Sequence, residues 1–98
     1  MIKTKRWNIL DHLRSEKDIK RYLDAAFEEG DPVFIATALG DVAKARKIMS
    51  RAARRAGIAR ESIYQSLSKK GKPQFSTILS VIDSLGYQLA VIPHKKAN

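Results

Sequence analysis

Apolar residues recur at helical spacing along most of the chain, and glycine or proline interrupts them at intervals. An apolar stripe that begins at Ser15 or Asp18 ends at Gly30, which predicts a first helix. Asp31-Pro32 opens the next predicted helix, because Asp can cap a helix and Pro suits its first position. That helix runs to about residue 47, with Gly40 as a candidate break.

Residues 49–68 predict two short helices joined by a tight turn at Gly57, a position that often needs a positive φ. Ser50 is expected to cap the first helix, whose alanine-rich inner face lets a second helix cross closely. Ile63 and Leu67, four residues apart, supply the buried side of the second helix. This layout is typical of a DNA-binding helix-turn-helix, in which the second helix enters the major groove.

The last third of the chain predicts a further helix, which Ser76 can cap and which ends at Gly86. Residues 87–92 are β-prone, but a lone strand is not stable by itself. The strand must therefore pair with another copy, a partner chain or a segment not recognised in the sequence. The expected fold is mainly α, with five helices and a short C-terminal β-strand. It divides into an N-terminal arm at 1–17, a domain at 18–92 and a tail at 93–98.

The composition excludes several classes of protein. The chain has 98 residues and no cysteine, which rules out disulfides and thiolate metal sites. No apolar run approaches the roughly 18 residues of a transmembrane helix. The charged N-terminus is followed by residues 7–12, which are not an apolar signal core. We therefore expect a cytoplasmic protein that does not associate with a membrane.

The net charge of +9 is informative mainly through its location. Residues 1–43 hold seven Lys/Arg and eight Asp/Glu, and residues 73–98 hold two and one. Residues 44–72 hold ten Lys/Arg against Glu61 alone, so the whole excess falls on the predicted helix-turn-helix and its flanks. This segregation favours a phosphate-binding face. An anionic membrane is a weaker rival, since these basic residues flank small alanines instead of a Trp/Phe/Leu stripe.

The second helix of the motif carries polar residues suited to base edges in the major groove. Arg60 can bond a guanine edge through two donors, and Gln65 can do the same for adenine. Glu61 either accepts from cytosine or complements the positive helix N-terminus. Tyr64 either contacts DNA or is partly buried. The candidate base-reading residues are Arg60, Glu61, Ser62, Tyr64 and Gln65.

Two clusters flank this helix and are candidates for phosphate contacts. One surrounds the start of the preceding helix, where backbone N–H groups favour anions. The other follows the recognition helix in a basic turn. Such contacts add affinity and salt dependence without reading sequence, although a single surface lysine is usually just solvated. The candidates are Arg46, Lys47, Ser50, Arg51, Lys69, Lys70, Lys72, Gln74 and Ser76.

Catalysis finds little support in the sequence. His12 and His94 are isolated near the termini, without ligand-like spacing to acids. The chain contains no Gly-rich phosphate loop, nucleophile elbow or defensible pair of catalytic carboxylates. We therefore expect a protein that is not an enzyme and needs no metal or cofactor.

Several motifs occur in a fixed order over about residues 7–92. They are Asp18-Ile19, the runs at 22–32 and 38–46, Ala53, Gly57-Ile58, Arg60-Glu61-Ser62-Ile63-Tyr64, Leu67-Ser68, Lys72-Pro73-Gln74-Phe75 and Leu85-Gly86. In this combination the chain resembles the probable addiction-module antidote proteins, a branch of the Cro/CI-type helix-turn-helix family. The resemblance implies an antitoxin encoded beside a RelE/ParE-like toxin, often one that cleaves mRNA. Such antitoxins bind the toxin and, commonly as homodimers, repress their own promoter at palindromic double-stranded DNA.

The chain departs from these relatives at two places. Lys47-Ile48 stands where similar proteins tend to have a glycine before the Met-Ser pair. Ala59 stands where a Ser or Thr cap usually opens the recognition helix, which weakens that helix start by about 0.5–2 kcal/mol. The second departure makes a shift in the start of the recognition helix an open alternative.

Two other functions fit the same residues. A stand-alone phage-type repressor uses the same DNA-binding machinery, so the sequence does not separate it from an antitoxin. A toxin-binding module with little DNA binding is the third alternative. It would use the chain from Trp7 to Phe27, with its acidic helix end, and the C-terminal strand, which could pair with the toxin by edge addition. The candidate toxin-binding residues are Trp7, Tyr22, Asp24, Phe27 and Glu28.

Overall fold

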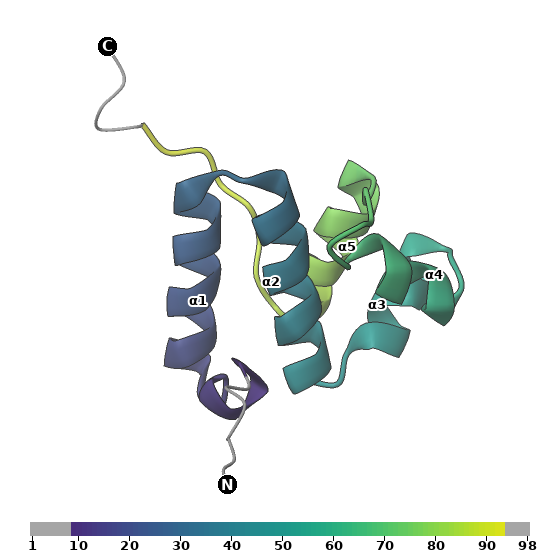
Figure 1. Ribbon diagram of the computed structural model, residues 1–98, viewed down its shortest axis with the longest axis horizontal. Helices are drawn as coiled ribbons and strands as arrows, with labels where there is room; N and C mark the ends of the chain where they lie inside the picture. The colour runs from purple at the N-terminus through teal and green to yellow at the C-terminus, as the bar shows by residue number, and fades with distance from the viewer. Residues whose placement is uncertain (1–8, 94–98) are drawn as a thin grey trace, which may run out of the picture.

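The computed structural model describes residues 9–93, and this part of the chain is almost entirely helical (Figure 1). A short 3-10 helix, η1, comes first, and five α-helices follow it, as the sequence predicts. Their bounds are η1 Ile9–His12, α1 Glu16–Glu29, α2 Pro32–Ala45, α3 Met49–Ala56, α4 Arg60–Ser66 and α5 Phe75–Ser84. No helix within residues 9–93 has the length and apolar character needed to cross a membrane.

The first two α-helices begin at side-chain caps. The Ser15 hydroxyl accepts a hydrogen bond from the backbone N–H of Asp18 at 3.1 Å, and the Asp31 carboxylate accepts one from Val33 at 3.3 Å. These bonds satisfy backbone donors that the first turn of a helix leaves open. The predicted starts of both helices are therefore confirmed, with Ser15 rather than Asp18 as the cap of α1. The end of α2 falls at Ala45, two residues before the predicted end.

The predicted serine caps of α3 and α5 are wrong. The cap residues are Ile48 and Gln74, and neither makes a side-chain cap hydrogen bond. Ser50 and Ser76 each lie one residue inside the helix that they were expected to cap. In α3 the start is set by packing, because Ile48 and the neighbouring Met49 are buried in the core. Burial of two large apolar side chains outweighs the typical 1 kcal/mol of a serine cap.

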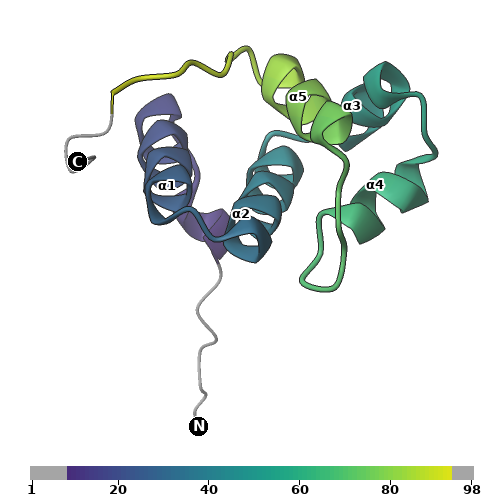
Figure 2. The ribbon, with the colours of Figure 1, turned by 90° about the horizontal axis from the view of Figure 1, so that it is seen from above.

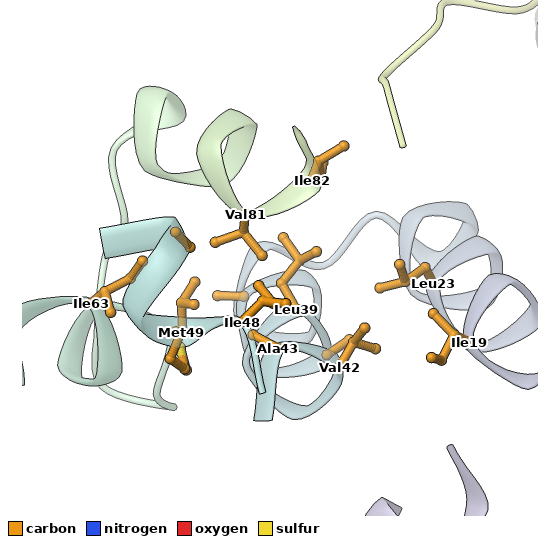
Figure 3. Packing of buried hydrophobic residues seen from close by; sticks show 14 of the residues in the cluster. Ile19, Leu23, Leu39, Val42, Ala43, Ile48, Met49, Ile63, Val81 and Ile82 are labelled. Carbon is orange, nitrogen blue, oxygen red and sulfur yellow. The ribbon is translucent and has the colours of Figure 1, made fainter. Parts of the chain in front are cut away.

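Helix α2 is the centre of the molecule. It packs against α1 on one side and against α5 on the other (Figures 1 and 2). Leu39 and Val42 are fully buried, between Leu23 of α1 and Val81 of α5 (Figure 3). The first residues of the predicted arm also join this core, because η1 contacts α2 and Leu13 is buried. Residues 1–8 and 94–98, which include Trp7 and most of the predicted tail, lie outside the described part of the chain.

Gly40 does not break α2, which runs through it without interruption. It is instead a point of close approach between α2 and the end of α4. A Cβ atom at this position would lie 2.9 Å from the carbonyl oxygen of Leu67 and 3.2 Å from its Cβ. Leu67 is the C-cap of α4, so the absence of a side chain at Gly40 lets α4 seat against α2.

The C-terminal segment departs from the prediction. Residues 87–92 form no strand in this part of the single chain, and their side chains are largely exposed. The last backbone hydrogen bond within residues 9–93 is donated by the Tyr87 N–H to the Ile82 carbonyl oxygen at 3.0 Å. Within residues 9–93 the segment has no neighbouring strand, and an unpaired strand gains no ladder hydrogen bonds. It runs instead from the end of α5 toward α1 (Figure 2).

Glu16 ties this segment to the helices. Its carboxylate accepts a hydrogen bond from Tyr87 Oη at 2.6 Å and forms an ion pair with Arg46 at the C-terminal end of α2. The hydrogen bond from Tyr87 lowers the pKa of the Glu16 carboxyl, and Arg46 lowers it further, while desolvation opposes them. The same hydrogen bond raises the pKa of Tyr87. Three segments distant in sequence therefore meet at one carboxylate.

Substituting Gly40→Ala tests the close approach of α2 and α4. In an open helix this change gains about 1 kcal/mol of helix propensity. Here the added methyl group meets backbone, so we expect a net loss of about 1–2 kcal/mol in the free energy of unfolding, measured by urea denaturation. Ala25→Gly on the exposed face of α1 is the control for propensity and should cost about 1 kcal/mol. A stabilised Gly40→Ala variant would refute the packing argument.

Candidate nucleic-acid interface

Helices α3 and α4 are the two short helices that the sequence predicts on either side of Gly57. Ala52 and Ala53 of α3 are buried, and their small side chains let α4 pack close to α3. Gly57 has φ 73°, and its N–H donates to the carbonyl oxygen of Arg54 at 3.2 Å, which ends α3. Ile63 is fully buried on the inner side of α4. The polar side of α4 therefore faces outward.

Helix α4 begins at Arg60, with Ala59 as its N-cap and without a side-chain cap bond. The start of the helix is thus not shifted by the missing Ser or Thr. The structure places all five candidate base-reading residues on this helix. Four of them are exposed and Tyr64 is half-buried; the exposed four are Arg60, Glu61, Ser62 and Gln65.

Tyr64 is contacted by two cations. Arg60 Nη2 donates a hydrogen bond to Tyr64 Oη at 3.0 Å, and the guanidinium carbon lies 4.9 Å from the ring centroid. Lys44 Nζ, from α2, lies 5.8 Å from the same centroid. A cation over an aromatic face is attracted by the ring quadrupole. The ring of Tyr64 therefore restricts Arg60 at the first residue of α4, which the sequence alone did not indicate.

The basic turn after α4 is folded back against the end of that helix. A Cβ atom at Gly71 would lie 2.2 Å from the carbonyl oxygen of Gln65 and 2.4 Å from that of Ser66, so only glycine fits this contact. The side chains of the turn are exposed, and Figure 2 shows the turn looping from α4 back to α5. It presents Lys69, Lys70 and Lys72, followed by the exposed Gln74 and Ser76 at the start of α5. Lysines near a helix C-terminus also complement its negative dipole end.

Two of the candidate phosphate-binding residues make contacts within the fold. Arg46 forms an ion pair with Glu16, as described above. Arg51 Nη1 donates to the carbonyl oxygen of Ser84 at 3.3 Å, at the C-terminal end of α5. Both side chains therefore hold helices together in this chain. Lys47 and Ser50 remain exposed at the start of α3.

Arg54 is a cation that sequence reasoning missed. It is exposed, and no ion pair or hydrogen bond of its side chain occurs with the described residues. It lies one helical turn after Ser50, on the same stripe of α3. Arg55, the next residue, points elsewhere and forms an ion pair with Asp83 of α5. In the sequence, the spacing of four residues between Ser50 and Arg54 could have indicated that Arg54 lies on the same side of α3 as a candidate phosphate contact.

The family of probable addiction module antidote proteins matches residues 3–93, which is nearly the whole chain. The chain belongs to this antidote family. An uncharacterized protein of Haemophilus influenzae is 42% identical over 87 residues, which cover 89% of this chain and 89% of that protein. No solved structure matches the chain significantly. An antidote implies a toxin as a partner and indicates a regulatory protein rather than an enzyme.

The candidate toxin-binding residues of this antidote lie on α1, apart from Trp7. Tyr22 is engaged inside the fold, since its hydroxyl donates to Asp41 Oδ2 at 2.9 Å and its ring packs in a T-shaped arrangement with the ring of Phe34. Burial raises the pKa of Tyr22, and the bond to Asp41 raises it further. Phe27 packs against the core, and Asp24 pairs with Lys20. Glu28 is exposed.

Lys47 of this antidote adopts a backbone conformation that favours glycine. Its φ is 58°, in the left-handed region, and it is the sole non-glycine residue within 9–93 with a positive φ. The conformation turns the chain between α2 and α3. The departure at Lys47-Ile48 noted in the sequence falls at this strained position. The side chain of Lys47 is exposed and places a positive charge beside the start of α3.

Substituting Lys47→Gly should therefore stabilise the antidote. Relief of the left-handed strain is worth about 1–2 kcal/mol, and the added freedom of the unfolded chain offsets about 0.4–1 kcal/mol. We expect a net gain of about 0.5–1 kcal/mol in the free energy of unfolding by urea denaturation. Lys47→Ala removes the same side chain but keeps the Cβ, so it should bring no gain. Equal stabilities of the two variants would show that Lys47 is not strained.

Proposed function

We propose that this antidote is a DNA-binding repressor of its own operon that also neutralises a RelE/ParE-like toxin. In this proposal α3 and α4 act as a Cro/CI-type helix-turn-helix, with α4 in the major groove. The active form is a homodimer on palindromic operator DNA. Its two recognition helices would then lie about one DNA turn apart, near 34 Å.

The observation that carries this proposal is the position of the unpaired cations around α4. Within the described residues, five exposed basic side chains of the segment 44–72 have no ion pair, hydrogen bond or contact with an aromatic ring, and Glu61 is the one acid of that segment. They come from the start of α3, its outer stripe and the basic turn: Lys47, Arg54, Lys69, Lys70 and Lys72. Unpaired cations on both flanks of a helix suit two phosphate backbones bordering a groove.

The N-terminal helices have the opposite charge. Residues 9–43, which form η1, α1 and most of α2, hold eight Asp/Glu against four Lys/Arg. A field of this kind turns the α3–α4 side toward a polyanion and the α1 side away from it. The division supports one face for DNA and another for the toxin.

Arg60 is the proposed reader of a guanine. The ring of Tyr64 supports its guanidinium at 4.9 Å, so less side-chain freedom is lost when the guanidinium bonds a base. Tyr64 then acts as a positioning residue, which agrees with its partial burial. Gln65 and Glu61 are exposed on the same helix and can contact neighbouring base pairs.

Substituting Arg60→Ala should reduce preference for the operator. We expect operator affinity to fall by about 1–3 kcal/mol while affinity for random DNA changes much less, measured by fluorescence anisotropy with both duplexes. Arg60→Lys keeps the charge but loses the two-pronged donor, so it should lose the preference as well. Equal losses on both duplexes would make Arg60 a phosphate contact.

Arg54 and Arg55 offer a matched pair for the phosphate contacts. Arg54→Gln should weaken binding roughly fivefold, equivalent to about 1 kcal/mol, and to a similar degree on operator and random DNA. Arg55→Gln removes the same charge from the next residue, but that charge is already paired with Asp83. It should change the affinity much less. If both variants bind equally weakly, net charge rather than a defined face governs binding.

The acidic side supports the toxin-binding part of the proposal. Glu28 and Glu29 are exposed at the end of α1, where a basic partner would meet them. The product of the adjacent gene, co-expressed with this chain, should co-purify with it. Glu28→Lys combined with Glu29→Lys should weaken the complex at least tenfold, since it places like charges against the partner. Glu61→Lys, an acid-to-base change outside this face, is the control.

The outcomes separate the three functions. A complex without DNA binding would leave a toxin-binding module with little DNA binding. DNA binding without a complex would leave a stand-alone phage-type repressor. A complex whose affinity is unchanged by Glu28→Lys combined with Glu29→Lys would place the toxin on another surface of the chain.

A further inference from the structure

The segment that follows α5 exposes apolar side chains to water. Val91 is 100% exposed and Ile92 is 77% exposed, and Leu89 is also exposed. Within residues 9–93 no backbone hydrogen bond is formed by residues 88–93. The segment thus combines β-branched side chains with open backbone donors and acceptors, which is the condition for pairing with another strand.

The base of the segment is fixed. The Tyr87 N–H donates to the Ile82 carbonyl oxygen at 3.0 Å, and its hydroxyl donates to Glu16 at 2.6 Å. From this anchor the segment runs past α2 toward α1, away from α4 (Figures 1 and 2). A partner on the segment would therefore leave the outer side of α4 accessible.

We propose that residues 88–92 of two copies pair as an antiparallel two-stranded ribbon centred on Ala90. This interface rests on the homodimer of the proposed function and supplies a surface for it. With Ala90 on the two-fold axis, Leu89 of each copy lies opposite Val91 of the other. Opposite residues of an antiparallel pair share a face, so four apolar side chains gather on one side of the ribbon.

Other registers of the same ribbon are less favourable. A register shifted to place Leu89 opposite Ala90 would put the apolar residues of one copy beside Gln88 and Ala90 of the other. An axis on Leu89 would need Tyr87 as a ribbon residue, but Tyr87 is committed to Glu16. An axis on Val91 would bring in Pro93, which has no N–H to donate. The free stretch is thus 88–92, and its centre is Ala90.

The exposed side of α5 is the rival surface for a second copy. Phe75 is 66% exposed and Leu79 is 41% exposed, four residues apart. Unlike the C-terminal segment, α5 already has its backbone groups paired within the helix. The C-terminal segment gains both apolar burial and backbone hydrogen bonds from pairing, and its pattern is complementary to itself. These two gains favour the ribbon over the face of α5.

Single cysteines test the register directly, because the chain contains none. In the ribbon the two Ala90 Cα atoms lie about 4.5–5.5 Å apart, within the reach of a disulfide. Ala90→Cys should therefore form covalent dimers on mild oxidation at micromolar concentration. Gln88→Cys is the matched control, since its two copies lie about 13 Å apart and should remain largely monomeric on a non-reducing gel. Phe75→Cys tests the rival face of α5.

Efficient cross-linking through Phe75→Cys but not through Ala90→Cys would overturn the proposal. So would the absence of cross-linking at both, or equal cross-linking at Gln88 and Ala90. Sedimentation gives a second readout with the intact chain: Val91→Lys should raise the dimer dissociation constant at least tenfold. Its urea midpoint should be unchanged when measured well below that dissociation constant, where both chains are monomeric. Val33→Lys, which adds the same charge at another exposed valine, should leave the dimer unchanged.

The failure of this inference is distinguishable from the failure of the proposed function. A chain that binds its operator with preference but shows no Ala90 cross-link retains the repressor function and loses the ribbon. A chain that cross-links through Ala90 but has no affinity for DNA retains the ribbon and loses the repressor function.

Discussion

The position of α4 depends on two contacts that only glycine permits. Gly40 brings α2 against the carbonyl of Leu67, and Gly71 brings the basic turn against the last carbonyls of α4. Helix α4 has seven residues and no side-chain cap, so it is far too short to be stable alone. Its stability comes from burial of Ile63 and Leu67 and from these two approaches. The side chains of α4 and of the basic turn that are proposed to meet DNA are oriented by this arrangement.

The basic side chains of the segment 44–72 fall into two groups, those that pair with other helices and those that have no such partner within residues 9–93. Arg46, Arg51 and Arg55 face other helices, where Glu16, the Ser84 carbonyl and Asp83 accept them. The lysines of the turn and Arg54 have no such partner within the described residues. The paired arginines therefore add little to the affinity for a polyanion, and the unpaired ones are concentrated beside α4. In the proposed repressor this division fixes which face meets the DNA.

Most of the fold was predictable from the sequence, because apolar periodicity, Asp31-Pro32 and the helix-ending glycines are local signals. The cap of α3 was not, since burial of Ile48 and Met49 is a tertiary effect that outweighs the nearby serine. The cap of α5 was not either, and burial does not explain it, because Gln74 and Phe75 are exposed. The strand over 87–92 needs a second strand, which one chain does not supply in residues 9–93. For the candidate site, the sequence identified the basic segment 44–72, but it did not show which of its cations are left without a partner in the described part of the chain. Arg46 meets Glu16 from 30 positions away, and Arg55 meets Asp83 from 28, so neither pairing leaves a local trace.

In the proposed repressor a defined set of unpaired cations around α4 binds the DNA backbone. The most direct measurement is the affinity of the unmodified chain for the DNA upstream of its own gene as the salt concentration rises from about 50 to 200 mM. Five such cations per protomer predict a slope of log affinity against log salt of roughly −4 for a protomer and up to −9 for a dimer. Affinity that stays flat over this range would contradict the claim.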